Sequence, residues 1–253
     1  MPAQKITFKG SQGFELAAKL DTPEGEPKAY ALFAHCFTCG KDLNAINRIA
    51  KALNQDGIAL FRFDFTGLGL SNGDFANTNF SSNVQDLIAA ADYMRENLDA
   101  PSIMMGHSLG GAATLVAAHS VPEVKAVTTI GAPFDSVNVL KQFKNDLDRI
   151  EVDGEAEVKL AGRPFKMKKQ FIDDARSQNV EEHIRNLKKP LMVMHSPIDD
   201  TVDIDHARRI YEAARHPKSF VSLDKADHLL LKNASDGIFA ARIISAWASQ
   251  YIA

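Results

Sequence analysis

The sequence predicts an α/β fold in which a mostly parallel central sheet carries helices on both faces. Short apolar runs of strand length alternate along the chain with longer segments whose apolar residues recur at helical spacing. The 253 residues, 45% of them hydrophobic, are enough for one large core. Polar residues suited to chemistry follow several of the apolar runs, and ligands bind at the carboxyl ends of the strands in sheets of this kind.

The first twenty residues predict a hairpin at one edge of the sheet. Residues 5–8 and 14–20 alternate apolar and polar side chains on either side of a turn at residues 10–13. This alternation is typical of strands that have one face in solvent. Proline and glycine at residues 23–27 then break the chain.

Strands and helices alternate over most of the rest of the chain, which predicts a parallel arrangement. We expect strands at residues 30–34, 58–64, 124–130, 191–194 and 219–223, and in the apolar run that ends at Gly106. We expect helices at residues 43–53, around 84–94, directly after Ser108, at 205–214 and near the C-terminus, where Ile238, Ile243, Trp247 and Tyr251 share one face.

The alternation fails between Pro133 and Pro190. Residues 134–148 and 171–187 have helical patterns, and residues 158–167 read as a hairpin that turns at Ala161-Gly162. The segment is too long for a connection and too organised for a linker. We interpret the chain as a single domain, 1–253, with a small cap inserted at about 134–189 over the carboxyl end of the sheet. A peripheral insertion away from the site is the alternative.

Composition narrows the class of partner. The net charge is −3, from 29 basic and 32 acidic residues mixed along the chain, so the sequence carries no basic patch for nucleic acid or for an anionic membrane. The N-terminus lacks the apolar core of a signal peptide, and no apolar run is long enough to cross a bilayer. We expect a cytoplasmic protein that acts on a small molecule without a metal or other cofactor. The sequence leaves open whether the protein forms a homo-oligomer.

Two cysteines, Cys36 and Cys39, make up the whole thiol content of the chain. This number excludes a disulfide framework, and a zinc site would need other ligands. A redox pair with C-x-x-C spacing usually lies in the first turn of a helix, whereas residues 40–42 intervene here. We favour two cysteines that pack near a loop, with a redox role as the alternative.

The segment Gly106-His107-Ser108-Leu109-Gly110-Gly111 predicts a nucleophile elbow. An apolar strand ends at Gly106, Ser108 follows at the tip of a sharp turn, and a run of small and apolar residues then begins a helix. The tight turn requires tiny residues two positions before and after the serine. At the start of a helix the amides, including that of Leu109, point toward negative charge that develops beside Ser108.

A serine nucleophile needs a base and a group that orients the base. His228 follows the last predicted strand, whereas the other histidines lie within or beside helices and strands or at the ends of earlier strands. Asp199 and Asp200 follow the strand at 191–194. We prefer Asp199 because its spacing to Val202 is usual at this turn, but spacing does not separate adjacent residues. The chain order of nucleophile, acid and base is the one expected for this elbow.

The oxyanion formed during acyl transfer needs two donors. The amide of Leu109 is one candidate. The second should come from the loop after the strand at 30–34, where we choose the amide of Phe37, with Cys36 as the alternative.

These residues carry a resemblance to α/β-hydrolase fold serine hydrolases. More narrowly, the chain resembles over nearly its whole length the hydrolase half of bacterial proteins that join such a hydrolase to an OsmC-like domain. The motifs that carry the resemblance are His35-Cys36-Phe37-Thr38-Cys39, the segment from Phe61 to Gly69, Asn79-Phe80-Ser81-Ser82-Asn83, the elbow, and the segment from His216 to Leu223. The chain ends at Ala253, so we expect no OsmC-like domain. Cys36 replaces the glycine that usually follows the histidine of this loop.

The sequence thus predicts a serine hydrolase that cleaves a small ester or thioester through an acyl-enzyme intermediate. Ser108, His228 and Asp199 form the predicted triad, and the amides of Leu109 and Phe37 form the predicted oxyanion hole. Two alternatives remain: a ligand-binding protein of the same fold without catalysis, and a hydrolase with a redox switch at Cys36 and Cys39.

Overall fold

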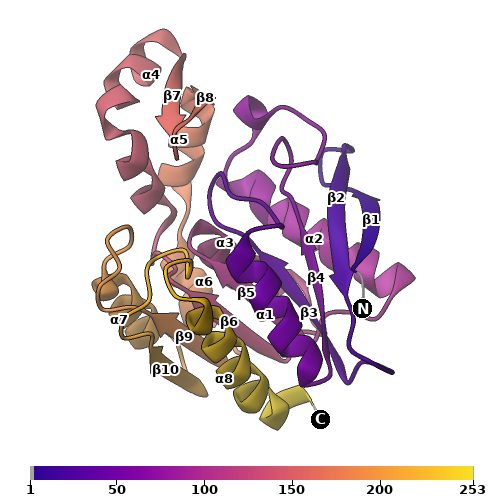
Figure 1. Cartoon of the computed structure of the whole chain (residues 1–253). Coiled ribbons are helices and arrows are strands. Elements are labelled where there is room, and N and C mark those ends of the chain that lie inside the picture. Colours follow the sequence, from indigo (N-terminus) through magenta and orange to yellow (C-terminus); the bar gives the residue numbers. More distant parts are fainter. Residues whose placement is uncertain (1–2, 253) are drawn as a thin grey trace.

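The computed structural model describes residues 3–252 and confirms the predicted fold class (Figure 1). An eight-stranded sheet has the strand order β1-β2-β4-β3-β5-β6-β9-β10. Among the described strands of this sheet, only the pairs β1/β2 and β2/β4 are antiparallel, so the hairpin lies at one edge as predicted. The strands are β1 (Gln4–Lys9), β2 (Glu15–Asp21), β3 (Ala29–Ala34), β4 (Ile58–Phe63), β5 (Ile103–His107), β6 (Ala126–Ile130), β9 (Leu191–His195) and β10 (Lys218–Ser222).

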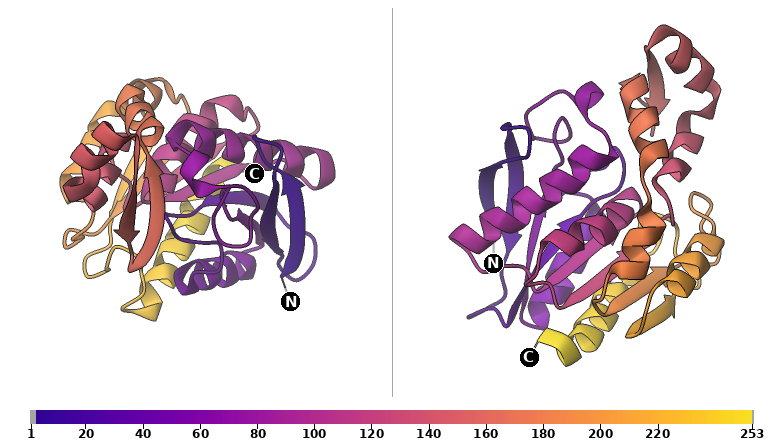
Figure 2. Two further views of the ribbon diagram at one scale, coloured as in Figure 1. Left: turned by 90° about the horizontal axis from the view of Figure 1, so that it is seen from above. Right: turned by 180° about the vertical axis from the view of Figure 1, so that it is seen from behind.

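Helices cover both faces of the sheet (Figures 1 and 2). On one face α1 (Asn44–Gln55) packs against α8 (Ala234–Ile252). On the other face α3 (Leu109–Ala117) packs against α2 (Phe80–Asn97) and α6 (Val180–Asn186), and α6 contacts α7 (Ile204–Ala213). Because the central strands are covered on both sides, β4, β5, β6 and β9 are buried at every residue, and most of their residues are apolar with no alternation between two faces.

The face predicted for α8 packs in part, because Trp247 is buried and Ile243 and Tyr251 pack against the same core cluster. Ile238 is 36% exposed, whereas small residues such as Gly237, Ala241 and Ala248 face the sheet and α1. A side chain at Gly237 would meet the Ala45 carbonyl oxygen at 3.4 Å. A methyl group there would make an ordinary van der Waals contact, so α8 packs close to α1 through small residues, which hydrophobic spacing alone does not reveal.

The segment between β6 and β9, residues 134–189, is here called the cap segment. It holds the short helices η3 (Ser136–Asp146), α4 (Leu147–Asp153), α5 (Lys169–Ser177) and α6, and the separate two-stranded sheet of β7 (Glu155–Leu160) and β8 (Arg163–Lys168). The predicted hairpin is confirmed. In Figure 1 its strands and α4 stand above the carboxyl ends of the central strands, while α6 lies against α3.

The prediction of two uninterrupted helices in the cap segment, at residues 134–148 and 171–187, was wrong, because each is broken. The first is a 3₁₀ segment that is interrupted at Phe143 (φ −136°) before α4 begins. The second breaks at residues 178–179, because Asn179 caps a new helix by accepting a hydrogen bond from the Glu182 N–H. Two other short 3₁₀ helices are η1 (Phe75–Asn77) and η2 (Ala118–Ser120).

No helix within residues 3–252 combines the length and the apolar character needed to cross a membrane.

Replacement of Gly106 by alanine should destabilise the fold at the elbow. A Cβ atom there would lie 2.4 Å from the Gly110 carbonyl oxygen and 2.5 Å from the Gly111 Cα, where backbone cannot yield. We expect Gly106→Ala to lower the free energy of unfolding by about 2 kcal/mol or more, measured by urea denaturation. The matched control Gly237→Ala has room for its methyl group and should leave stability equal or higher by about 0.5 kcal/mol. Equal stability of the two variants would contradict the close packing of β5 on α3.

Candidate active site

Ser108 lies at the tip of the turn between β5 and α3 in a conformation that few residues adopt. Its backbone has φ 54° and ψ −129°, outside the regions favoured by residues with a side chain. The turn is held because the Ser108 N–H donates to the Ile130 carbonyl oxygen at 2.9 Å, and the Ser108 carbonyl accepts from the Gly111 N–H at 2.8 Å. The result is a hydroxyl held at the carboxyl edge of the sheet.

The structure brings His228 and Asp199 to this hydroxyl from two other connections. His228 Nε2 lies 3.0 Å from Ser108 Oγ, and His228 Nδ1 lies 2.7 Å from Asp199 Oδ2. His228 stands in the loop between β10 and α8, and Asp199 follows β9. With a proton on Nδ1 donated to the carboxylate, Nε2 is free to accept the serine proton.

The geometry separates the two candidate acids. The Asp199 side chain is only 2% exposed, and its Oδ1 accepts the backbone N–H groups of Thr201 and Val202, each at 2.9 Å. Asp200 is exposed, and its carboxylate accepts a hydrogen bond from the Thr201 hydroxyl. Of the adjacent pair, Asp199 is therefore the residue that contacts His228.

Hydrogen bonds keep Asp199 ionised. Burial acts to raise the pKa of the Asp199 carboxyl, but the hydrogen bond from His228 and those from the Val202 and Thr201 amides outweigh it and lower the pKa below its usual value. A negative carboxylate at this place would stabilise a positive charge on the His228 ring.

Two buried histidines next to the triad are neutral. His107 donates from Nε2 to the His228 carbonyl oxygen at 2.7 Å, and burial with the nearby His228 lowers its pKa to about 3. His195 donates from Nε2 to the Val202 carbonyl oxygen at 2.8 Å, and burial lowers its pKa as well. His107 thus fixes the backbone of His228, and His195 fixes the loop that contains Asp199. Because both rings are neutral, neither adds a positive charge next to His228.

A third neutral histidine holds the loop after β3. His35 Nδ1 donates to the Cys36 carbonyl oxygen at 2.8 Å, and its Nε2 accepts the Phe65 N–H at 3.3 Å. Burial is the main cause that lowers the pKa of His35. This side chain therefore links the loops that follow β3 and β4.

The loop after β3 contains a disulfide between Cys36 and Cys39. The prediction of two cysteines that merely pack near a loop was wrong in this respect. The chain turns back so that the Cys39 N–H donates to the Cys36 carbonyl oxygen at 3.1 Å, which brings the two Cα atoms to 5.3 Å. The disulfide closes a ring of four residues that includes Phe37.

The two residues predicted to supply the oxyanion hole, Leu109 and Phe37, both line one small cavity. Leu109 begins α3, where the first N–H groups have no partner in the helix. The Phe37 N–H has no hydrogen-bond partner among the residues that the structure describes. The cavity of about 10 Å³ is lined by both residues, and by His35, Cys36, Phe65, Leu68, Phe75, Asn83 and Gly110. It has room for about one water molecule.

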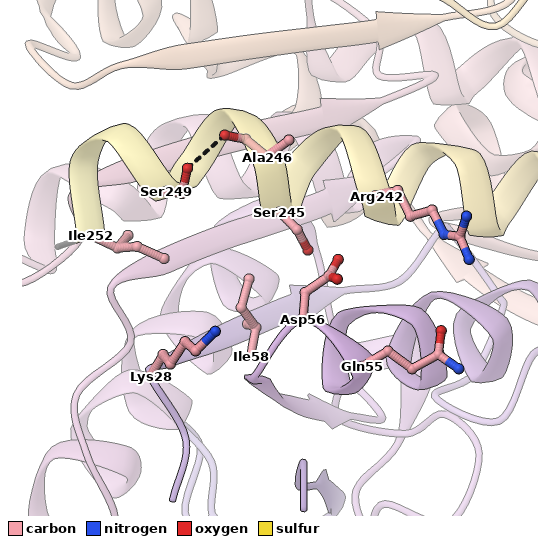
Figure 3. Close-up of a pocket in the computed structure, with 9 residues that line it drawn as sticks. All are labelled: Lys28, Gln55, Asp56, Ile58, Arg242, Ser245, Ala246, Ser249 and Ile252. Atoms are coloured by element: carbon pink, nitrogen blue, oxygen red, sulfur yellow. Dashed lines mark hydrogen bonds between the residues drawn. The ribbon is translucent and has the colours of Figure 1, made fainter.

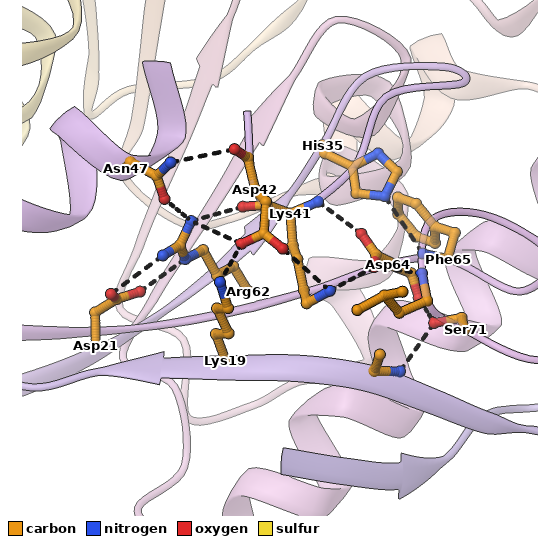
Figure 4. A network of polar contacts seen from close by, with 12 residues as sticks. Lys19, Asp21, His35, Lys41, Asp42, Asn47, Arg62, Asp64, Phe65 and Ser71 are labelled. Atoms are coloured by element: carbon orange, nitrogen blue, oxygen red, sulfur yellow. Dashed lines mark hydrogen bonds and ion pairs between the residues drawn. The ribbon is translucent and has the colours of Figure 1, made fainter. Parts of the chain in front are cut away.

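The far end of the same loop is fixed by a buried ion pair (Figure 4). Lys41 Nζ lies 2.6 Å from Asp64 Oδ2, and the Lys41 N–H donates to Asp64 Oδ1 at 2.6 Å. Arg62 donates to the Lys41 carbonyl oxygen at 2.6 Å and forms an ion pair with Asp21. Lys41, Arg62 and Asp64 are each at most 3% exposed, so removal of one partner would leave a buried charge without its counter-charge.

A larger cavity of about 850 Å³ lies elsewhere, between α1 and α8 (Figure 3). Ser245 and Asp56 point toward one another across it. It is lined by Lys28, Gln55, Asp56, Ile58, Arg242, Ser245, Ala246, Ser249 and Ile252. It shares no residue with the cluster around Ser108, so size alone does not locate the chemistry.

Known proteins include relatives that are similar to this chain in sequence and in structure. An esterase domain of a Rhodothermus marinus protein is 44% identical, with a TM-score of 0.80 and full coverage of both chains. The chain belongs to the α/β-hydrolase family. The family described as "Serine aminopeptidase, S33" matches residues 25–150 of this hydrolase. Est1E of Butyrivibrio proteoclasticus, 21% identical with a TM-score of 0.79, covers 98% of this chain and 99% of its own and shares the fold.

Curated relatives of the hydrolase are more distant. The mitochondrial palmitoyl-protein thioesterase ABHD10 of Rattus norvegicus is 27% identical over 207 residues, which are 77% of this chain and 66% of the relative. The chain thus spans just under two thirds of that relative's length. The narrower resemblance to hydrolases fused to OsmC-like domains stays a prediction.

Sequence reasoning missed the structural roles of three histidines. His35, His107 and His195 each directly follow a predicted strand, and this position was the available signal. Their roles depend on which carbonyl each ring meets across the sheet edge, and spacing along the chain does not report that contact.

Because these three histidines are neutral in the folded chain, we expect the hydrolase to lose stability at acid pH. Above pH 6.5 these side chains are neutral in both folded and unfolded chains. Between pH 6.5 and about 3 the unfolded chain takes up protons that buried His107 does not, and His35 and His195, whose pKa values are also lowered, act in the same direction. The free energy of unfolding should therefore fall as the pH drops through this window. Urea denaturation at pH 7, 6, 5 and 4 measures it, with a shallower dependence expected for His107→Gln. A flat or rising stability on acidification would contradict the neutral histidines.

Proposed function

We propose that this α/β-hydrolase is a serine hydrolase that cleaves a small ester or thioester through an acyl-enzyme intermediate. The observation that carries the proposal is the continuous contact from Asp199 through His228 to Ser108, with distances of 2.7 and 3.0 Å. A chain of acid, base and hydroxyl in this order makes a weakly nucleophilic serine reactive. The family relationship supports hydrolysis of ester or thioester bonds.

In the first half of the proposed reaction Ser108 Oγ attacks the carbonyl carbon while His228 Nε2 takes its proton. Asp199 stabilises the resulting imidazolium, and the amides of Leu109 and Phe37 bind the negative oxygen. His228 then gives the proton to the leaving group. In the second half a water molecule attacks the acyl group on Ser108, with His228 again as the base.

Reaction with a fluorophosphonate probe tests the nucleophile. The probe should modify the wild type on Ser108, identified by peptide mass spectrometry, and should leave Ser108→Ala unmodified because no other activated hydroxyl is expected at the site. Equal modification of both proteins would overturn the assignment. Binding of esters without turnover, together with an unmodified wild type, would instead favour the non-catalytic binding protein.

Replacement of the two adjacent acids separates their roles. Asp199→Asn should lower kcat by a factor of about 10³ to 10⁴, because the amide cannot hold the tautomer of His228 or balance its charge. Asp200→Asn is the matched control at the neighbouring, exposed position and should keep kcat within about twofold of the wild type. Steady-state hydrolysis of a p-nitrophenyl ester measures both. Similar losses in the two variants would contradict the role of Asp199.

The disulfide supports a second candidate, a hydrolase whose activity depends on the redox state of Cys36 and Cys39. The four-residue ring includes Phe37, the proposed second oxyanion donor. We infer that reduction by a dithiol, which is itself oxidised as two cysteine thiols form, frees this loop and weakens oxyanion binding.

Activity should then fall several-fold after reduction and recover on reoxidation, whereas Cys36→Ser should show the lower activity under both conditions. Hydrolysis rates measured with and without dithiothreitol test this effect. Identical kinetics of the oxidised, reduced and Cys36→Ser proteins would remove the switch while leaving the hydrolase assignment intact.

Three further expectations remain predictions. The first is that the partner is a small-molecule acyl substrate and not a nucleic acid or a membrane. The others are a cytoplasmic location and a homo-oligomer as a possible assembly.

A further inference from the structure

The loop after β3 is held on three sides, and the cap segment provides one of them. His35 fixes its beginning, and the Asp64–Lys41 ion pair fixes its end. Between these points Arg163 of β8 donates from Nη2 to the Thr38 carbonyl oxygen. The cap segment therefore contacts the four-residue ring that carries the Phe37 amide.

Thr38 needs external contacts to keep its conformation. Its φ is 59°, in the left-handed region that a β-branched residue rarely adopts. Thr38 is 3% exposed, and its carbonyl oxygen is the acceptor that Arg163 binds. Such backbone conformations persist where the surroundings determine them, and they concentrate at functional sites. Arg163 supplies one of these determining contacts.

Aromatic packing joins the same two parts of the molecule. The Phe37 ring lies 5.4 Å from that of Phe171 in α5 and 5.8 Å from that of Phe75 in η1. Phe75 in turn packs at 4.8 Å against Phe165 of β8. The Arg163 guanidinium lies 5.3 Å from the Phe165 ring centroid, which restricts its position. The cap segment thus holds both the side chain of Phe37 and the backbone of the next residue.

We propose that Arg163 is a positioning residue of the hydrolase: through Thr38 it directs the Phe37 amide toward the oxyanion. This inference rests on the proposed serine hydrolase function. The Phe37 N–H has no hydrogen-bond partner within residues 3–252, so the direction in which this N–H points is set by the turn that contains Phe37. Docking of the cap segment on the loop and completion of the oxyanion hole are then one event. A displaced cap segment removes the Arg163 hydrogen bond and the Phe171 contact together.

Because an oxyanion donor acts mainly in the transition state, the effect of Arg163 should appear in kcat. Arg163→Met retains much of the aliphatic side chain but removes the donors, and it should lower kcat about tenfold with KM within about twofold of the wild type. Arg163→Lys keeps a cationic donor and should recover part of the loss. Steady-state hydrolysis of a short-chain p-nitrophenyl ester measures these values.

Lys166→Met is the matched control. Lys166 lies on the same strand, β8, and pairs with Glu155 of β7 within the small hairpin, on exposed surface. This variant removes a cation from the hairpin without touching the loop, and its kcat should stay within about twofold of the wild type. Thermal unfolding of all the variants measures any general loss of structure. Phe171→Leu removes the aromatic ring that contacts Phe37 and should also lower kcat.

A transition-state analogue gives an independent readout. The affinity of a trifluoromethyl ketone, which forms a tetrahedral adduct on serine, should fall in Arg163→Met by the same factor as kcat/KM. Unchanged analogue affinity, a rise in KM alone, or equal effects of Arg163→Met and Lys166→Met would overturn the role of Arg163 while the hydrolase assignment stands. Absence of turnover and of adduct formation in the wild type would overturn the proposed function and this inference with it.

Discussion

The contact between His228 and Asp199 is the interaction on which the arrangement of the site depends. A buried carboxylate is costly unless hydrogen bonds favour its charge, and Asp199 receives them from His228 and from two backbone amides. The loop that supplies those amides is fixed by His195, and the loop of His228 is fixed by His107. Since both histidines are neutral, the ion pair formed during a proton transfer from Ser108 would face no neighbouring imidazolium.

The fold brings these groups together because each follows a strand of the same parallel sheet. Ser108 comes after β5, Asp199 after β9 and His228 after β10. Ser108 accepts an unfavourable φ of 54° because the Ile130 carbonyl oxygen and the start of α3 hold the turn on both sides. The second oxyanion candidate is different, since its loop is secured by residues from β4, from its own disulfide and from the cap segment. Rigidity of the elbow is thus local, whereas that of the Phe37 loop depends on distant parts of the chain.

This difference explains how much could be predicted from the sequence. The parallel sheet and its edge hairpin follow from local patterns, and the close contacts of Ser108, His228 and Asp199 follow from their places after strands. The preference for Asp199 over Asp200 also agrees with the contacts, although spacing alone left both open. The small-residue face of α8, the break before Asn179 and the disulfide could not be predicted, because each depends on tertiary packing or on the detailed path of a loop. The same holds for Arg163, whose partner Thr38 lies 125 positions away in the sequence.

In the proposed mechanism Ser108 becomes acylated during turnover. The most direct measurement is rapid mixing with a slowly deacylating p-nitrophenyl ester, followed by acid quench and peptide mass spectrometry. We expect a burst of p-nitrophenol equal to the enzyme concentration, with the acyl group on the peptide that contains Ser108. Turnover without a burst and without an acylated Ser108 peptide would contradict it.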